Sequence, residues 1–383
     1  MPMYLTEQLA QEIVDRTMAI LPFNINVMDH DGRIIGSGDR RRLFKKHQVA
    51  HEVVRRKETI EIRKVDTNQW EGVKEGINLP ILFQGKVLGV VGITGDLDEA
   101  RGYGQLVKVT TEMMIEQAFM QSQLQLDKRL KEEIVHQLIS GNLLREELLF
   151  EKAKSVQIDL HIPRVAVVLK SHAHQLESNQ KVEFVINEMK EEGDLVVPTY
   201  TGEVIILKKV QVVHGRCDQE RTLSTIRIWL SRLKKMDPAV QVAIGTYYTE
   251  LDKLSKSYQE AKETLVVGEK LAPHENLLLY DDFSMYVFVN ELAKSVDQNP
   301  FLNLITKLKE HDELGELQRT LEVYIQESGK AINTANELFI HRNSLQYRLE
   351  KIKEITGKDP RDYKDLFELY LAKIIEKLIA DKE

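Results

Sequence analysis

Apolar residues in the first third of the chain alternate between helical spacing and strand spacing. Leu5, Leu9 and Ile13 recur every four residues, which predicts an amphipathic helix. Further on, apolar and polar residues alternate on both sides of two turns, which predicts β-hairpins within residues 25–35 and 77–94. Short antiparallel strands flanked by helices indicate a small α+β sensory domain, PAS-like in outline.

A long helical pattern follows, from Tyr103 to about Ser140. An apolar stripe lies at positions close to a heptad, and Asp127 interrupts it; its members are Leu106, Met113, Met120 and Ile134, with Leu124 and Leu138. The pattern suits a helix that dimerises, and it suits equally well a helix packed in the core of one chain. Both interpretations make it a connection between the sensory domain and the rest of the protein.

The middle of the chain is predicted to have the element order βαββαβα. Strands are expected at 163–170 and 240–247, a hairpin at 195–209, and helices at 176–192, 223–235 and 251–268. This order is typical of a ferredoxin-like layer of helices on an antiparallel sheet.

Two short helices joined by a tight turn are predicted within residues 334–356. Thr334 begins a capping box, so we expect it to cap the first helix. Leu345, Leu349 and Ile352 recur at intervals of 4 and 3, which predicts a second helix with one buried stripe. Such a pair is what a helix-turn-helix needs to enter a major groove.

The face of the second helix opposite its buried stripe is rich in hydrogen-bond donors. Arginine can contact guanine and asparagine adenine, while lysine and serine can bind phosphates. Residues 330–364 hold 8 Lys/Arg against 5 Asp/Glu in a chain of net charge -7, which favours a local contact with a polyanion. On pattern alone, a helical hairpin with a solvated face is the alternative. The candidate DNA-binding residues are Thr334, Arg342, Asn343, Ser344, Gln346, Tyr347, Arg348 and Lys351.

Composition describes an ordinary globular protein with room for two or three domains in 383 residues. No stretch approaches about 18 apolar residues, and the N-terminus lacks the pattern of a signal peptide. The single cysteine, Cys217, has no partner for an internal disulfide and no set of metal ligands around it. We therefore expect a cytoplasmic protein with no membrane segment, metal or cofactor. Because no P-loop or His-Glu-x-x-His motif occurs, no catalytic residue is assigned.

A cluster of cations follows the first hairpin, at residues 40–46, beside Gly38 and Asp39. Guanidinium groups bind carboxylates through paired N–H bonds, and glycines let backbone N–H groups approach an anion. We expect residues 92–95 to form a bend with further free donors, and Asp39 and Asn78 to bind hydroxyls. This pocket would suit a small hydroxylated acid; the alternative, which the residues alone favour, is a solvated basic face.

Three parts of the chain resemble known families. The string ELFIHRNSLQYRLEKIKEITGKDPRD resembles the C-terminal DNA-binding domain of the carbohydrate diacid regulator and purine catabolism regulator families, which implies a Fis-like helix-turn-helix at about 321–378. DHDGRIIGSGDRRRL and INLPILFQGKVLGVVGITGD resemble the sugar diacid recognition domain, over about residues 3–136. The middle resembles a degenerate GGDEF-like module, whose hairpin reads Tyr200-Thr201-Gly202-Glu203-Val204, so catalysis is not expected.

The resemblance implies a transcription factor whose N-terminal domain senses diacids such as glucarate or galactarate, or the related acid glycerate. The positions that match the family's ligand site are Ser37, Gly38, Asp39, Arg42, His47, Asn78, Pro80, Gly92, Thr94 and Gly95. After Arg42 the family usually has a glycine two positions on and then a His-Glu-Gly-Ala run. This chain has Phe44 and His47-Gln48-Val49-Ala50, which changes the space and hydrogen bonding beside the proposed pocket.

Together these features predict an α+β multidomain protein with three parts. They are a sugar diacid or hydroxy-acid recognition domain with a long C-terminal helix at 1–136, a GGDEF-like domain at 137–275, and a helical region at 276–383 that contains the helix-turn-helix. We expect an effector-responsive activator of sugar diacid, glycerate or related hydroxy-acid catabolism. Its expected partners are double-stranded DNA with an inverted-repeat operator, a small acidic metabolite, and further copies of the chain in a homodimer or higher oligomer. The alternative is a nucleotide-binding or cyclase-like signalling enzyme that uses the central domain.

Overall fold

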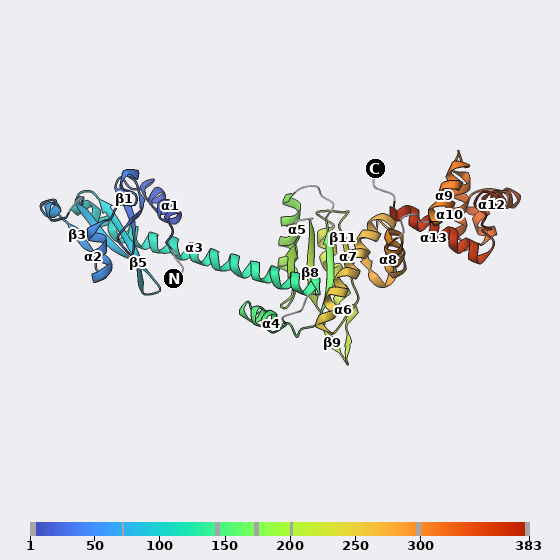
Figure 1. The fold of residues 1–383 in the computed structure, drawn as a ribbon, viewed down its shortest axis with the longest axis horizontal. Coiled ribbons are helices and arrows are strands. Elements are labelled where there is room, and N and C mark those ends of the chain that lie inside the picture. Colours follow the sequence, from blue (N-terminus) through green and yellow to red (C-terminus); the bar gives the residue numbers. More distant parts are fainter. Residues whose placement is uncertain are drawn as a thin grey trace. The chain divides into compact units, whose positions relative to one another are not determined.

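The computed structural model describes residues 5–70, 73–141, 146–171, 176–199, 202–295 and 300–379. The chain divides into two compact units, Met1–Arg129 and Leu130–Glu383. Figure 1 shows the helices and strands of each unit. Within the described ranges, no helix is both long enough and apolar enough to cross a membrane.

The first unit is built on a five-stranded antiparallel sheet in the order β2-β1-β5-β4-β3. Its strands are β1 (Asn24–Asp29), β2 (Ile34–Ser37), β3 (Ile60–Ile62), β4 (Gly76–Phe83) and β5 (Lys86–Thr94). Both predicted hairpins are present. The second turns through Gln84 and Gly85, which have φ angles of 49° and 76°, as a tight two-residue hairpin requires.

Helices cover both faces of this sheet (Figure 1). Helix α1 (Glu7–Met18) and the first part of α3 (Leu97–Ser140) pack on one face, and α2 (Gln48–Arg56) packs on the other. Because side chains alternate along a strand, Ile25 and Val27 face α1, while Met28 and Val90 share a core with α2. Two short 3₁₀ turns, η1 (Arg40–Arg42) and η2 (Lys64–Gln69), complete the unit, and the predicted α+β character is confirmed.

Helix α3 runs without a break from Leu97 to Ser140 and contributes to both units. Val107 and Ile115 are buried against the sheet of the first unit, whereas Ile134 and Leu138 are buried in a core of the second. The predicted apolar stripe is therefore divided. Its last part is core, and its first part is exposed, at Leu106, Met113, Met120 and Leu124.

The second unit contains a five-stranded sheet in the order β12-β11-β6-β8-β7. Its elements are α4 (Glu146–Ser155), β6 (Arg164–Lys170), α5 (Leu176–Met189), β7 (Leu195–Pro198), β8 (Glu203–Lys209), β9 (Val212–Val213), β10 (Arg216–Cys217), α6 (Gln219–Leu233), β11 (Gln241–Ile244), η3 (Leu251–Lys253), α7 (Leu254–Leu271) and β12 (Leu277–Leu279). The run from β6 to α7 contains the predicted βαββαβα order. Helix α4, the small β9–β10 hairpin and the parallel strand β12 were not predicted. Helices α5 and α6 pack on one face of the sheet and α7 on the other.

The rest of the second unit is helical, as predicted. It contains α8 (Tyr280–Ser295), α9 (Pro300–Glu310), α10 (Glu316–Gln326), α11 (Ala331–Glu337), α12 (Arg342–Thr356) and α13 (Tyr363–Ile379). Helix α13 contributes Leu369 and Ala372 to a core with α9 to α12. Its next turns contribute Ile374 and Leu378 to the core that contains α7 and α8. One helix thus belongs to both cores of this unit.

Candidate functional site

Helices α11 and α12 form the predicted helix-turn-helix. Between them Phe339 has a left-handed φ of 54°, and the N–H of Ile340 donates to the carbonyl of Ala335 at 3.0 Å, which closes the end of α11. The His341 ring nitrogen Nδ1 accepts from the N–H of Asn343 at 3.2 Å and so caps α12. The predicted stripe packs inward, with buried side chains at Leu345, Leu349 and Ile352.

The predicted capping role of Thr334 is wrong. Helix α11 begins at Ala331, so Thr334 lies inside the helix, where its hydroxyl donates to the carbonyl of Lys330 at 3.0 Å. Threonine can bond back to the carbonyl four residues earlier, so the Thr/Glu spacing fits a helix interior as well as a cap. The Thr334 side chain is fully buried, which removes it from the candidate DNA contacts.

The exposed face of α12 begins at its first residue. Arg342, Asn343 and Ser344 are exposed, and in the described part of the chain their side chains form no hydrogen bond or ion pair. These groups stand at the N-terminal turn of the second helix, the part of a recognition helix that reaches base edges. They are therefore free to bind a base edge or a phosphate without losing a partner within the protein.

The next turn of α12 adds an aromatic ring and a cation to the same surface. Gln346 and Tyr347 are exposed. The Lys351 ammonium lies 5.9 Å from the centre of the Tyr347 ring and pairs with Glu354 at 2.6 Å. That carboxylate raises the pKa of Lys351, so the lysine is charged but partly neutralised by its own helix.

Arg348, which was expected to flank the buried stripe and to contact DNA, is engaged within the protein. Its side chain is 19% exposed, and its guanidinium nitrogen Nη2 lies 2.9 Å from Oε1 of Glu316. Its Nη1 donates to the hydroxyl of Thr320 at 3.4 Å. Both partners belong to α10, a helix whose position no local pattern in α12 reveals. Arg348 therefore ties α12 to α10.

One exposed residue beside α12 was missed. Phe339, in the turn, is 94% exposed although it is a large apolar side chain. Phenylalanine can contact the methyl group of thymine in a major groove. The signal in the sequence was a large aromatic residue in the turn between the two predicted helices.

In the first unit, several effector candidates meet in one row across the sheet. Ser37 pairs with Asn26, Asn26 with Gly92, and Gly92 with Asn78, so these residues of four adjacent strands point to the same face. The Ser37 hydroxyl donates to Oδ1 of Asn26 at 2.7 Å. A side chain at Gly92 would place its Cβ 2.8 Å from Oδ1 of Asn78, so only glycine leaves this space open. The polar row lies on the face that α2 covers.

Asn78 is the least satisfied member of this row. The residue is 5% exposed, and among the described residues its amide forms no side-chain hydrogen bond. Leaving a buried amide without a partner costs about 1–3 kcal/mol unless water or a ligand binds it. The amide is therefore available to a polar ligand.

Arg42 ends η1, and His47 caps α2, the helix that covers the face of the polar row. Half-burial lowers the pKa of the Arg42 guanidinium. Burial, together with the positive charge of Arg42, lowers the pKa of His47 to about 4. The His47 Nδ1 accepts from the N–H of Ala50 at 3.3 Å, so the neutral ring carries its proton on Nε2. His47 can thus donate one hydrogen bond at neutral pH while Arg42 supplies the charge.

Asp39 is engaged within its own loop. Its carboxylate accepts from Nε and Nη2 of Arg41 at 2.9 and 3.1 Å and caps η1 through the N–H of Arg41. The Arg41 contact lowers the pKa of Asp39, with a smaller contribution from the charge of Lys74. Asp39 therefore has a partner within its own loop, and its expected contact with a hydroxyl stays a prediction.

The remaining candidates lie around the polar row. Pro80 pairs with Val90 in the apolar row beside it, and Thr94 pairs with Asn24 and Gly76 on its other side. The N–H of Gly38 donates to the carbonyl of Ile25 at 3.1 Å, and that of Gly95 to Glu75 at 3.1 Å.

The predicted donor-rich bend at 92–95 is wrong, because residues up to Thr94 belong to β5. This strand lies between β1 and β4, so its backbone groups pair with both neighbours. The sequence pattern missed Asn24 and Asn26, although they alternate with Ile25 and Val27 and so mark the polar side of β1.

Phe44 occupies the position at which the resemblance implied a glycine. Its φ is 67°, a left-handed conformation that favours glycine, and its N–H donates to the carbonyl of Ile34 at 2.8 Å. The ring is 50% exposed and lies 4.8 Å from the Arg33 guanidinium. The backbone therefore retains the shape that a glycine would adopt.

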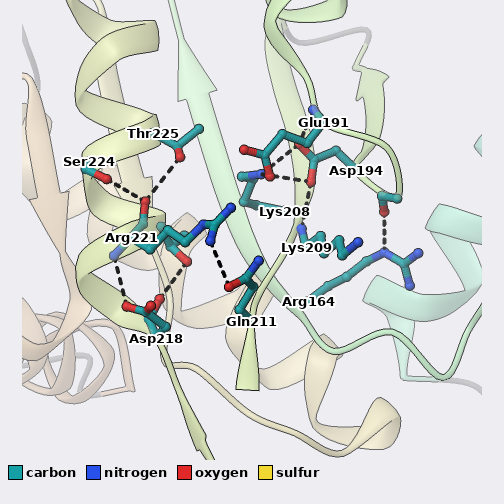
Figure 2. A network of polar contacts seen from close by, with 12 residues as sticks. Arg164, Glu191, Asp194, Lys208, Lys209, Gln211, Asp218, Arg221, Ser224 and Thr225 are labelled. Carbon is teal, nitrogen blue, oxygen red and sulfur yellow. Dashed lines mark hydrogen bonds and ion pairs between the residues drawn. The ribbon is translucent and has the colours of Figure 1, made fainter. Parts of the chain in front are cut away.

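The central sheet contains a buried ion-pair network (Figure 2). Lys208 is 1% exposed, and its ammonium lies 3.0 Å from Asp194 and 2.9 Å from Glu191. Asp194 also accepts from the N–H groups of Glu191 and Lys209. The network therefore links the turn that precedes β7, which contains Glu191 and Asp194, to Lys208 and Lys209 of β8. Of the predicted GGDEF-like hairpin, Tyr200 and Thr201 lie outside the described residues.

An exposed donor-rich helix in a helix-turn-helix, on a chain with a separate α+β unit, defines a DNA-binding regulator. Family models match three consecutive segments: sugar diacid recognition at residues 5–138, a GGDEF-like domain at 140–267, and a PucR C-terminal helix-turn-helix domain at 317–375. The chain is 35% identical over 375 residues to the carbohydrate diacid regulator of Escherichia coli strain K12. The match covers 96% of this chain and 97% of that protein. The chain belongs to the carbohydrate diacid regulator family.

Shorter matches link it to other regulators of Bacillus subtilis strain 168. It is 32% identical over 151 residues to the proline-responsive transcriptional activator PutR, covering 38% of this chain and 36% of that protein. It is 31% identical over 183 residues to the DNA-binding transcriptional activator AdeR, covering 46% and 43%. The protein is accordingly a DNA-binding transcription regulator and not an enzyme, and its GGDEF-like domain is degenerate.

Proposed function

We propose that this protein is a cytoplasmic, effector-responsive activator of genes for the catabolism of a sugar diacid, glycerate or a related hydroxy-acid. The first unit binds the acid, and the helix-turn-helix binds an inverted-repeat operator. Its family membership supports a regulator, and the polar row in the first unit supports an acidic, hydroxylated effector.

The observation that carries the effector proposal is the unpartnered Asn78 amide in a row with Asn26 and Ser37, on the sheet face that α2 covers. An amide can bind a hydroxyl as donor and acceptor together, and a guanidinium binds a carboxylate through two parallel N–H bonds. Because Arg42 is half-buried, its attraction for a carboxylate is less screened than at an exposed site. His47 adds one neutral donor, so the site favours an anion with adjacent hydroxyls over a simple phosphate.

The architecture supports a route from this site to DNA. The strand order β2-β1-β5-β4-β3 supports a PAS-like sensory domain, and the antiparallel order β11-β6-β8-β7 supports a ferredoxin-like central domain. Effector binding favours one arrangement of α3 and the second unit, which changes how two helix-turn-helix units meet the operator. In a two-fold complex the two α12 helices enter major grooves about 34 Å apart or a multiple of that spacing.

A thermal-shift titration of the full chain tests the effector class. Glycerate, glucarate, galactarate and tartrate are each added to the wild type, Arg42→Ala and Asn78→Ala. An acid that binds only the folded state adds about 2.7 kcal/mol of stability at 100 times its dissociation constant. We expect one acid to stabilise the wild type and to lose most of that effect in both variants.

Arg40→Ala is the matched control, because Arg40 is exposed and lies in the same 3₁₀ turn as Arg42. The control should respond to the acid like the wild type. Equal responses in all four proteins would place binding outside the polar row. No response to any acid in the wild type would contradict the proposed effector class.

A further inference from the structure

The first part of α3 has apolar side chains on two sides. On one side Val107 and Ile115 are about 1% exposed and belong to the core of the first unit. On the other side the side chains are between 41% and 68% exposed; they are Tyr103, Leu106, Val109, Met113, Met120 and Leu124. A helix that is apolar on both sides has a second partner, since one packed face accounts for only one stripe.

The outer side has the spacing of a coiled-coil seam. Two sets of side chains each repeat every seven residues, and the sets are offset by three or four residues. The first set is Leu106, Met113 and Met120, and the second is Tyr103, Thr110, Gln117 and Leu124. The outer stripe, defined as these seven residues, contains no charge over about 22 residues, or about 33 Å of helix. The next position of the seam is Asp127, where the pattern ends. An apolar surface this long that follows a seven-residue repeat fits another helix with the same repeat.

We infer that the outer stripe pairs with the outer stripe of a second copy of this chain, in a parallel two-stranded coiled coil. A two-fold axis brings each stripe residue next to its own counterpart, so the two Gln117 amides can hydrogen-bond to each other across the axis and set the register. The positions that flank the seam carry one charge between Tyr103 and Leu124, at Glu116, so like charges do not oppose the pairing.

Parallel pairing also suits the proposed function, on which its biological role rests. Helix α3 continues from the stripe into the second unit, which carries one helix-turn-helix. Two parallel α3 helices end side by side and bring two copies of the second unit together, as a two-fold operator requires. In an antiparallel pair the two ends would point in opposite directions.

Cross-linking tests the pairing without DNA or effector, so its outcome is independent of the proposed function. Cys217 is the only cysteine of the chain, and Cys217→Ser gives a clean background. In that background Leu106→Cys and Met120→Cys should each form a disulfide-linked dimer under mild oxidation. Ser122→Cys, exposed and outside the seam, is the matched control and should remain uncrosslinked.

The direction of the helices can be read from the same variants. A parallel pair cross-links Leu106→Cys to itself, whereas an antiparallel pair centred on the stripe cross-links it only in a mixture with Met120→Cys. Cross-links that form only in the mixture would overturn the parallel arrangement.

Sedimentation in solution gives the second measurement. We expect the wild type at twice the chain mass of 44.2 kDa, Met113→Glu/Met120→Glu at the mass of one chain, and Ser122→Glu at the wild-type mass. Helical content measured by circular dichroism should match in all three. A monomeric wild type, or a double variant that folds and stays dimeric, would overturn the inference. If the double variant fails to fold, Leu106→Gln/Met120→Gln, which introduces no charge, should weaken the dimer in the same way.

Discussion

Replacing either arginine of α12 by alanine should have opposite consequences for DNA binding and for stability. Arg342 is the exposed first residue of the helix, and within the described residues its side chain forms no ion pair. Arg348 is 19% exposed and pairs with Glu316 of α10 at 2.9 Å. Charge and sequence position alone would treat the two as equivalent, and only their surroundings separate them.

The magnitudes follow from these surroundings. Arg342→Ala should weaken operator binding by about 1–3 kcal/mol if the side chain reaches a base, or reduce the salt slope by about one if it binds a phosphate. Its effect on the free energy of unfolding should stay within about 0.5 kcal/mol, because it removes no contact in the protein. Arg348→Ala breaks an ion pair whose Glu316 side chain is 55% exposed, so the loss of stability should be about 1 kcal/mol.

Fluorescence anisotropy with operator DNA at several salt concentrations measures the first effect, and urea unfolding measures the second. Arg319→Ala is the matched control, because Arg319 is exposed on α10. The variant removes the same charge from α10 instead of α12. Apart from the small effect of losing one distant charge, operator affinity and the free energy of unfolding should match those of the wild type. The assignment of the two arginines would be refuted if Arg348→Ala lost affinity with unchanged stability, or if Arg342→Ala altered neither affinity nor salt slope.

Three further predictions concern stability. The pKa of His47 is lowered from 6.5 to about 4, so the unfolded chain takes up a proton at mildly acidic pH that the folded chain does not. The free energy of unfolding of the wild type, measured with urea, should therefore fall by about 2 kcal/mol between pH 7 and pH 5. His47→Asn keeps a capping acceptor, and its free energy of unfolding should fall by less over the same range. Phe44→Gly should be about 1 kcal/mol more stable than Phe44→Ala in the same assay, because both lose the ring and only glycine relieves the φ of 67°; equal stability would mean that the backbone is unstrained. Asp194→Asn should cost about 3–5 kcal/mol, since it leaves the buried Lys208 with one carboxylate, and a cost below 1 kcal/mol would show that Lys208 reaches solvent.

The amino-acid sequence alone determined the local elements and the class of protein. Hairpin turns such as Gln84-Gly85, and the stripe of Leu345, Leu349 and Ile352, follow from short-range rules of backbone conformation and periodicity, and the structure contains both. The residues around Arg342 pointed to a DNA-binding helix because donor type and local charge are visible in a short segment. Helix starts were less certain, as Thr334 shows, because one residue spacing fits both a cap and a helix interior.

Only the tertiary structure decided which polar side chains share a site and which are already engaged. Asn26 and Asn78 are 52 positions apart in the chain, and strand register through Gly92 brings them into one row. Arg348 is engaged by Glu316 and Thr320 of α10, a helix that no pattern within α12 specifies. Pairings of this kind depend on contacts between distant segments, whereas sequence patterns report the conformation of neighbouring residues. Most of the helices and strands could therefore be predicted from the sequence, whereas α4, the β9–β10 hairpin, β12 and the final composition of both candidate sites could not.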